Sequence, residues 1–158
     1  MDSVDPVGES WAAFSASAPE VADAGKRLLE DEPGVPGVAF LGTLGADGLP
    51  RIHPFIPAVM NGRLWAFVIE SPKQRDLDRT ERFAIHSRLG PHDESFFCAG
   101  NSQRVDAEDI RSTVGGGMPY SDIDDRHVLY ELRIARALWT TWTTPTAPVY
   151  RTWTSKQH

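Results

Sequence analysis

Hydrophobic positions first recur at helical spacing near the start of the chain. Between residues 21 and 29 the apolar side chains lie three or four positions apart, which places them on one face of a helix. A Ser-Ala-Pro-Glu sequence that begins at Ser17 has the form of a capping box, and Pro33 is expected to stop the helix. We therefore expect an amphipathic helix over about residues 17–31, after a loose arm at residues 1–16.

From residue 38 the pattern changes to short apolar runs that are typical of strands. The runs cover residues 38–44, 51–60 and 63–70, with a Gly-Ala-Asp-Gly turn after the first and Asn61-Gly62, a strong hairpin signal, after the second. We expect these three strands to form a meander. Both faces of the third run are apolar, so we expect a core to cover one face and a partner or a ligand to cover the other.

The rest of the chain contains more strand patterns and one further helix. Strands are expected at residues 83–87, 95–99, 127–142 and 149–154, and a helix capped by Asp106 is expected at residues 106–114. The chain shows six or more strands, two or three helices and no parallel strand-helix-strand rhythm. This combination predicts a mainly β, α+β protein, with residues 17–158 forming one closed or nearly closed antiparallel barrel.

Three tryptophans near the end of the chain indicate a further contact surface. Trp139 and Trp142 lie three residues apart, so in a strand they point to opposite faces. Together with Trp153 they suggest a face that meets another subunit. We therefore expect a homodimer.

Composition and charge limit the functions that the chain can have. Its 158 residues are enough for one domain with a buried core, and its formal charge of -6 argues against a nucleic-acid surface. Cys98 is the only cysteine, which excludes an intramolecular disulfide and fits a reducing compartment. No apolar run approaches membrane-spanning length. We expect a cytoplasmic protein with no membrane partner.

The most informative candidate chemistry lies in the sequence Ser-Pro-Lys-Gln-Arg-Asp-Leu at residues 71–77. Ser71 is placed to cap a helix whose first residue is Pro72. A helix start disfavours cations, yet Lys73 and Arg75 lie in this first turn. A bound phosphate would explain both residues, because helix starts attract anions. The alternative is a capped surface helix with two solvated basic side chains.

At this point the residues resemble a known family, the pyridoxamine 5'-phosphate oxidase-like split-barrel flavoproteins. The resemblance covers residues 38–114 and, more loosely, two later runs at residues 128–132 and 151–153. It rests on the order and spacing of several motifs rather than on one of them. The motifs are the Gly-Ala-Asp-Gly turn, Pro50-Arg51-Ile52-His53-Pro54, the Asn-Gly hairpin, Leu64-Trp65-Ala66-Phe67, the Ser71 to Leu77 sequence and Phe83-Ala84-Ile85-His86-Ser87.

The resemblance implies a homodimer of six-stranded Greek-key barrels with two to four flanking helices. It also implies that FMN, or the deazaflavin F420, binds in a groove between the subunits. Its motifs match the family's phosphate-binding residues, its strand beside the flavin ring and, with less support, a partner residue that reaches into the site. The matching residues of this chain are Arg51, Ser71, Lys73 and Arg75 for the phosphate, the backbone of Ile52, His53 and Pro54 for the ring, and Trp153 from the partner. Gln74, within the same sequence, is also expected to bind the cofactor.

Other residues offer less chemistry. His53 and His86 lie in strand patterns, where a histidine is more often a structural residue than a base. The His-Asp-Glu sequence at residue 92 and the aspartates at residues 122–125 lack the spacing of a metal site, and solvated loops explain them. Cys98 is expected to be an inert buried thiol. No hydrolase motif is present.

We therefore expect a flavin-dependent or deazaflavin-dependent oxidoreductase that transfers a hydride to or from a small organic substrate. The alternative is a non-catalytic protein of the same fold that binds, stores or senses the cofactor. F420 carries a polyglutamate tail, which would need more cations, such as Arg79, Arg82 and Arg88. Because the net charge is negative, FMN is the favoured cofactor.

Overall fold

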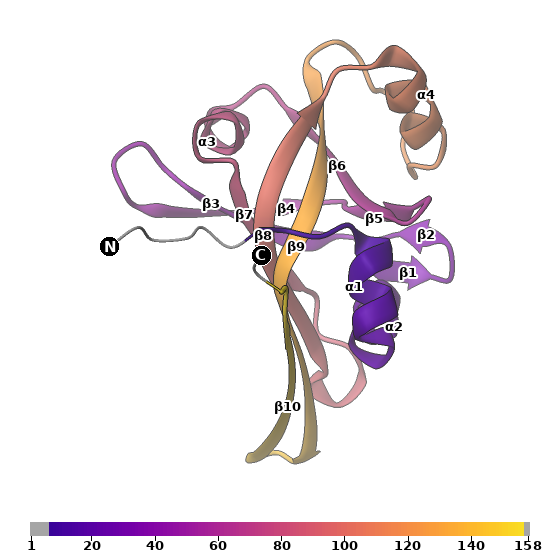
Figure 1. Ribbon diagram of the computed structural model, residues 1–158, viewed down its shortest axis with the longest axis vertical. Coiled ribbons are helices and arrows are strands. Elements are labelled where there is room, and N and C mark those ends of the chain that lie inside the picture. Colours follow the sequence, from indigo (N-terminus) through magenta and orange to yellow (C-terminus); the bar gives the residue numbers. More distant parts are fainter. Residues whose placement is uncertain (1–6, 157–158) are drawn as a thin grey trace.

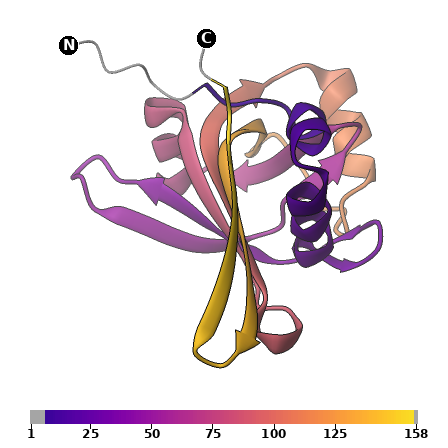
Figure 2. The same ribbon diagram turned by 60° about the horizontal axis from the view of Figure 1, so that its bottom comes forward.

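A twisted antiparallel sheet organises the computed structural model, which describes residues 7–156 (Figures 1 and 2). The elements in chain order are α1 (Trp11–Ser17), α2 (Pro19–Leu29), β1 (Glu30–Glu32), β2 (Val35–Pro36), β3 (Ala39–Leu44), β4 (Pro50–Phe55), β5 (Ala58–Met60), β6 (Arg63–Ile69), α3 (Pro72–Thr80), β7 (Arg82–Ser87), the 3-10 helix η1 (Pro91–Asp93), β8 (Ser95–Val105), α4 (Glu108–Gly116), β9 (His127–Thr144) and β10 (Ala147–Thr154). None of the helices in the described part is long and apolar enough to span a membrane.

The main sheet contains eight strands. Their order is β4-β3-β7-β8-β9-β6-β5, and β10 also pairs with β9. The long strand β9 pairs with β8 along one edge, whereas β6 and β10 pair with successive parts of its other edge. In Figure 1 the β9–β10 ribbon extends away from the rest of the sheet. The mainly β, α+β class is confirmed, and the sheet has more strands than the six that the resemblance implies.

The expected meander of three strands is also wrong at one connection. The run at residues 51–60 divides into β4 and β5, which lie at opposite ends of the strand order. The division falls at Ile56-Pro57, where proline fixes the backbone and has no N–H to donate. The hairpin from β5 to β6 is confirmed, and Asn61 and Gly62 have the positive φ angles, 53° and 73°, that its tight turn requires.

Residues 11–17 form α1, although most of them were expected to lie in a loose arm. The Ser10 hydroxyl caps this helix by accepting a hydrogen bond of 3.2 Å from the amide three residues later. Trp11 and Phe14 lie three residues apart on the face that the helix buries. Residues 1–6 of the expected arm lie outside the described residues.

The caps of two other helices differ from those expected. Ser17 ends α1 and accepts a hydrogen bond of 2.9 Å from the indole N–H of Trp153, so α2 begins at Pro19 without a side-chain cap. The helix α2 ends at Leu29, because the next residues form β1. Asp106 does not cap α4, since its carboxylate accepts a hydrogen bond of 3.0 Å from Arg104.

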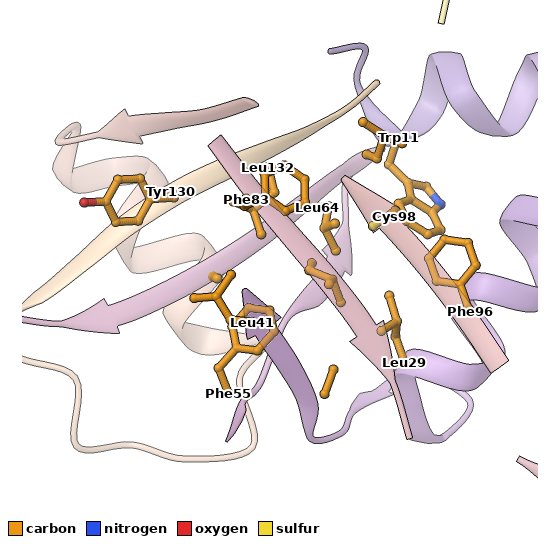
Figure 3. Close-up of a cluster of buried hydrophobic side chains, with 14 of the residues drawn as sticks. Trp11, Leu29, Leu41, Phe55, Leu64, Phe83, Phe96, Cys98, Tyr130 and Leu132 are labelled. Atoms are coloured by element: carbon orange, nitrogen blue, oxygen red, sulfur yellow. The ribbon is translucent and has the colours of Figure 1, made fainter. Parts of the chain in front are cut away.

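The larger core cluster lies between the sheet and the first two helices. Figure 3 shows Trp11 and Leu29 from these helices at one end of the cluster, near Phe96 of β8. Gly25 of α2 has no side chain, and a Cβ there would come within 2.7 Å of the Phe96 ring. Close packing between α2 and β8 therefore requires glycine at this position.

A second core cluster covers the other face of β6. Trp65 and Phe67 point into it and pack with Val114 of α4 and with Met118. The second apolar face of this strand is therefore covered by the chain's own α4 and the segment after it. The expectation that a partner or a ligand covers this face is wrong.

Candidate functional site

The start of α3 has the geometry that the sequence predicts. Ser71 is the N-cap and Pro72 is the first helical residue. The Ser71 hydroxyl donates a hydrogen bond of 2.7 Å to the carbonyl of Ile69 and accepts a longer one, 3.4 Å, from the amide of Gln74. Ser71 is therefore engaged in forming the helix start. Its role here is to shape the turn in which the cations lie.

The two cations of this first turn lack acidic partners. Lys73 is half-buried, Arg75 is exposed, and neither pairs with a carboxylate within residues 7–156. By contrast, Arg79 in the last turn of α3 donates to Asp76 and to the carbonyl of Leu44. Positive charge at the positive end of a helix dipole is unfavourable. An anion bound at this end would reverse that effect.

Arg51 reaches the same helix from β4. Its Nε donates a hydrogen bond of 3.0 Å to the carboxylate of Asp76, which also accepts 2.8 Å and 3.2 Å hydrogen bonds from Thr43 and Arg79. Asp76 is only 2 % exposed, so these contacts fix α3 to β3 and β4. Arg51 is held through Nε, and its terminal nitrogens make no hydrogen bond to another described residue. They are available to an anion.

The pKa of Asp76 reflects this network. Burial of the carboxyl raises the pKa, but the hydrogen bonds from Arg51, Thr43 and Arg79 outweigh burial and hold the pKa below its usual value. Asp76 is thus ionised at neutral pH. The sequence pattern alone does not mark Asp76 as a site residue. One signal could have indicated its burial. Asp76 directly precedes Leu77, and the helix has few other apolar residues that could form its buried face.

His53 lies two residues after Arg51 and therefore on the same face of β4. Its Nε2 atom is buried and makes no hydrogen bond to the described part of the chain. Burial lowers the pKa of His53, Lys73 and Arg51 lower it further, and Asp76 opposes them. The imidazole is therefore neutral at pH 7. A buried polar atom without a partner is rare in folded proteins.

These residues fit a phosphate-bearing cofactor. Arg51, Lys73 and Arg75 supply positive charge around the start of one helix, and the unpartnered His53 lies within the electrostatic reach of two of them. Arginine offers a planar fork to phosphate oxygens, and lysine a compact charge. Of the sequence-predicted site residues, Arg51 and Lys73 therefore act on the same imidazole, and Ser71 caps the helix that carries Lys73 and Arg75.

Ile52 and Pro54 face the opposite side of β4. The side chain of Ile52 is 72 % exposed. In the neighbouring strand β3, Phe40 and Leu44 lie on the same side of the sheet as Ile52 and are 40 % and 47 % exposed. We name these four residues the outer apolar surface. An exposed apolar surface of this kind is typical of a contact with a ligand or another protein.

Gln74 does not point into the site. Its side chain is buried and donates to Asp78 at 2.8 Å and to the Tyr130 hydroxyl at 3.1 Å. Tyr130 in turn donates a hydrogen bond of 2.6 Å to Asp78. Figure 3 shows the Tyr130 oxygen on the side of the ring away from Leu132. Gln74 thus anchors α3 to β9, and its side chain is used within the fold.

Trp153 also lies apart from the cations. Four strands separate β10 from β4 in the sheet. The Trp153 ring packs 4.8 Å from the Phe14 ring, between centroids, and its N–H donates to Ser17. Trp139 donates to Glu94 and lies under Arg151. Two of the three late tryptophans therefore contact their own chain, and a face that meets another subunit stays a prediction for these residues.

The remaining candidates serve the fold. His86 is exposed, and its Nδ1 lies 2.7 Å from the carbonyl of Ser87. Cys98 is fully buried, and burial raises the pKa of its thiol, as expected for an inert residue. Asp124 is engaged by Arg126 and His127. Residues 7–156 contain no group of three or more acidic, histidine or cysteine side chains that could hold a metal ion.

Comparison with known proteins rests on structure. No protein-family model matches the chain, and a search of curated proteins finds no match. A pyridoxamine 5'-phosphate oxidase-related, FMN binding protein from Nostoc punctiforme matches with a TM-score of 0.59 and 11% identity, over 89% of this chain and 96% of that chain. A heme binding protein from Mycobacterium smegmatis matches with a TM-score of 0.60 and 16% identity, over 83% of this chain and 57% of that chain.

A third match is the heme storage protein HutZ from Vibrio cholerae. Its TM-score is 0.55 at 11% identity, over 74% of this chain and 89% of that chain. Similarity at these identities establishes the fold, and proteins of this fold hold different cofactors. The chain has the split-barrel fold of the pyridoxamine 5'-phosphate oxidase-like proteins.

Proposed function

We propose that this protein binds FMN, with the phosphate at the start of α3 and the ring beside β4. The observation that carries the proposal is that Lys73 and Arg75 occupy the first turn of a helix and pair with no carboxylate in the described ranges. Arg51 adds a third cation, held in place by Asp76. A dianionic phosphate monoester would be bound by these groups and by the helix dipole together.

FMN suits the charge distribution better than F420, which remains the alternative. The polyglutamate tail of F420 would need cations beyond the phosphate site. Arg79 is engaged by Asp76 and the Leu44 carbonyl, and Arg88 pairs with Asp31. These arginines are therefore less available to a second acidic group, which favours the smaller ligand.

We further propose that the bound flavin serves an oxidoreductase with a small organic substrate. FMN supplies hydride transfer when it is bound. The residues of this chain would bind the phosphate, orient the ring along the β4 backbone and keep water from its face. Because the cofactor carries the hydride chemistry, this proposal assigns no side chain of the site as a catalytic acid or base.

The outer apolar surface supports a homodimer. Ile52, Phe40 and Leu44 are exposed beside the strand that carries Arg51 and His53. A second copy that covers this surface would bury apolar area on the face of β4 opposite to Arg51 and His53. This basis for a dimer replaces the second face of β6, which α4 covers.

Titration of cofactors into the purified protein tests the proposal. FMN, riboflavin, F420 and hemin are added separately, and absorption and fluorescence report binding. We expect FMN to bind at least about 100-fold more tightly than riboflavin, because riboflavin lacks the phosphate and each charge-assisted hydrogen bond contributes about 1.5–3 kcal/mol. Equal affinity for FMN and riboflavin would refute the phosphate site.

The FMN-loaded protein then separates an enzyme from a storage or sensing protein. A nicotinamide donor is added, and flavin absorption near 450 nm is followed. Bleaching followed by reoxidation with an organic acceptor supports an oxidoreductase. FMN that binds but stays oxidised supports the non-catalytic alternative. Tight binding of hemin in place of FMN would contradict both the FMN-dependent oxidoreductase and the non-catalytic FMN-binding protein.

A further inference from the structure

We propose that the imidazole of His53 takes up a proton when a phosphate-bearing ligand binds at the start of α3, and so becomes an additional cation of that site. The inference rests on the proposed phosphate site and goes beyond it, because it gives the neutral histidine a defined binding role. It also makes ligand affinity depend on pH in a direction that can be measured.

The geometry of the imidazole is the first support. Nε2 is buried without a partner, whereas Nδ1 is neither buried nor hydrogen-bonded within the described residues, so it is the nitrogen open to a ligand. The proton taken up on binding would therefore lie on Nδ1, where the imidazolium can donate it to a bound anion.

The charges that face His53 are the second support. Arg51 comes from the same strand face, and Lys73 and Asp76 come from α3. On β3 the residue paired with His53 is the uncharged Leu41. Asp76 is the acidic group that acts on the imidazole, and it already accepts hydrogen bonds from three donors. In the free protein, His53 therefore lies in a site with an excess of positive charge.

Binding of a divalent anion would change this balance. Burial and the two cations hold the pKa of His53 below its usual value in the free protein. An anion near Lys73 and Arg51 offsets their repulsion and attracts a proton to the imidazole, so the pKa rises on binding. A group whose pKa rises on binding strengthens affinity as the pH falls. That gain is lost as the pH rises above the pKa of the complex.

The phosphate of FMN titrates in the opposite sense. Its second pKa is about 6, so it loses charge in acid and by itself would bind more weakly there. Inorganic sulfate stays divalent across this range and isolates the contribution of the protein. The two probes therefore separate proton uptake by His53 from protonation of the ligand.

The first experiment is an NMR pH titration of the histidine ring protons, with and without saturating sulfate at constant ionic strength. The His53→Gln variant assigns the His53 signal. His86 serves as the internal control, because it is exposed on β7 and bonded to its own strand. We expect sulfate to raise the pKa of His53 by about one pH unit, which corresponds to a tenfold effect on affinity, and to leave His86 unchanged. An unchanged His53 would overturn the proposal.

The second experiment measures FMN affinity between pH 5.5 and 8.5 for wild type, His53→Gln and His86→Gln. The ratio of wild-type affinity to His53→Gln affinity should grow as the pH falls and approach about tenfold below the pKa of His53 in the free protein, while His86→Gln should follow wild type. A constant ratio, with FMN still preferred over riboflavin, would overturn the role of His53 and leave the phosphate site intact. Failure of wild type to bind either FMN or sulfate would remove the phosphate site itself. If His53→Gln does not fold, substitution of the other four histidines one at a time assigns the His53 signal by elimination, and the sulfate titration of wild type decides.

Discussion

Replacing Asp76 with asparagine should destabilise the fold, because this carboxylate holds three elements together. Asp76 of α3 accepts hydrogen bonds from Thr43 of β3, Arg51 of β4 and Arg79. Asparagine has nearly the same size but carries no charge and presents an amide that cannot accept from all three donors. The variant therefore isolates the charge and the hydrogen bonds from the volume of the side chain.

The expected cost follows from the burial of each partner. Removing one partner of a fully buried ion pair costs about 3–5 kcal/mol, because the remaining charge is left without compensation. Here the carboxylate is 3% exposed, but the side chains of Arg51 and Arg79 are 37% and 41% exposed, so water solvates them after the change. We therefore expect a loss of about 2–3 kcal/mol in the free energy of unfolding. For a chain of this size that corresponds to a decrease in Tm of roughly 5–10 °C.

Urea denaturation of wild type and Asp76→Asn at several pH values measures the effect. The pKa of folded Asp76 is lowered, so its stabilising contribution is complete above the unfolded pKa of about 3.9 and is lost as the pH falls through the folded value. The gap between the two proteins should be constant from pH 7 to about pH 5 and should shrink below about pH 4. Asp31→Asn is the matched control, because Asp31 pairs with Arg88 at the surface and should contribute less than about 0.5 kcal/mol. A gap for Asp76→Asn no larger than that of the control would refute this reasoning.

Three further predictions concern the phosphate site, the assembly and the first helix. Lys73→Ala and Arg75→Ala should each weaken FMN binding roughly tenfold or more without lowering the Tm of the ligand-free protein, since each removes a charged partner but also relieves the helix dipole; unchanged affinity in the double variant would exclude the site. Wild type should sediment as a dimer at micromolar concentration and Ile52→Arg as a monomer; a monomeric wild type would contradict the proposed interface. Phe14→Ala should lower the free energy of unfolding by about 3–5 kcal/mol in urea, because Phe14 is fully buried among aromatic rings; a cost below about 1 kcal/mol would mean that α1 packs loosely.

The elements that the sequence predicts well have strong local signals. The turn between β5 and β6 requires two positive φ angles, which Asn61-Gly62 supplies. The start of α3 follows from Ser71 and Pro72, whose preferences for the cap and the first helical position agree. In both places local chemistry alone determines the conformation, so the prediction and the structure coincide.

Errors arise where a partner distant in the sequence decides the outcome. Ser17 has the form of a cap, but Trp153 uses its hydroxyl, and Asp106 is used by Arg104. The apolar second face of β6 correctly indicated burial, but the pattern could not show that α4 provides it. Periodicity reports that a surface is covered, whereas only the three-dimensional arrangement identifies what covers it.

The helix α1 was missed for a different reason. It is only seven residues long, which is too short for a clear helical period. Ser10 followed by Trp11 and Phe14 nevertheless has the spacing of a capped helix with two buried residues. This spacing leads to a helix only where the two rings can be buried. In the structure they pack against aromatic rings of β8 and β10.

The same tertiary context explains how the residues of the Ser71 to Leu77 sequence divide between fold and ligand. Gln74 bonds to Tyr130, and Asp76 bonds to Arg51, so the fold uses these two polar side chains to fix the helix. Lys73 and Arg75 remain without acidic partners among the described residues, in a turn where the helix dipole disfavours them. Lys73 and Arg75 lie two positions apart, so their side chains leave the helix in different directions. Each is nevertheless unfavourable at the positive end of the helix dipole in the free protein, and each would be favourable beside a bound anion, as the proposed phosphate site requires.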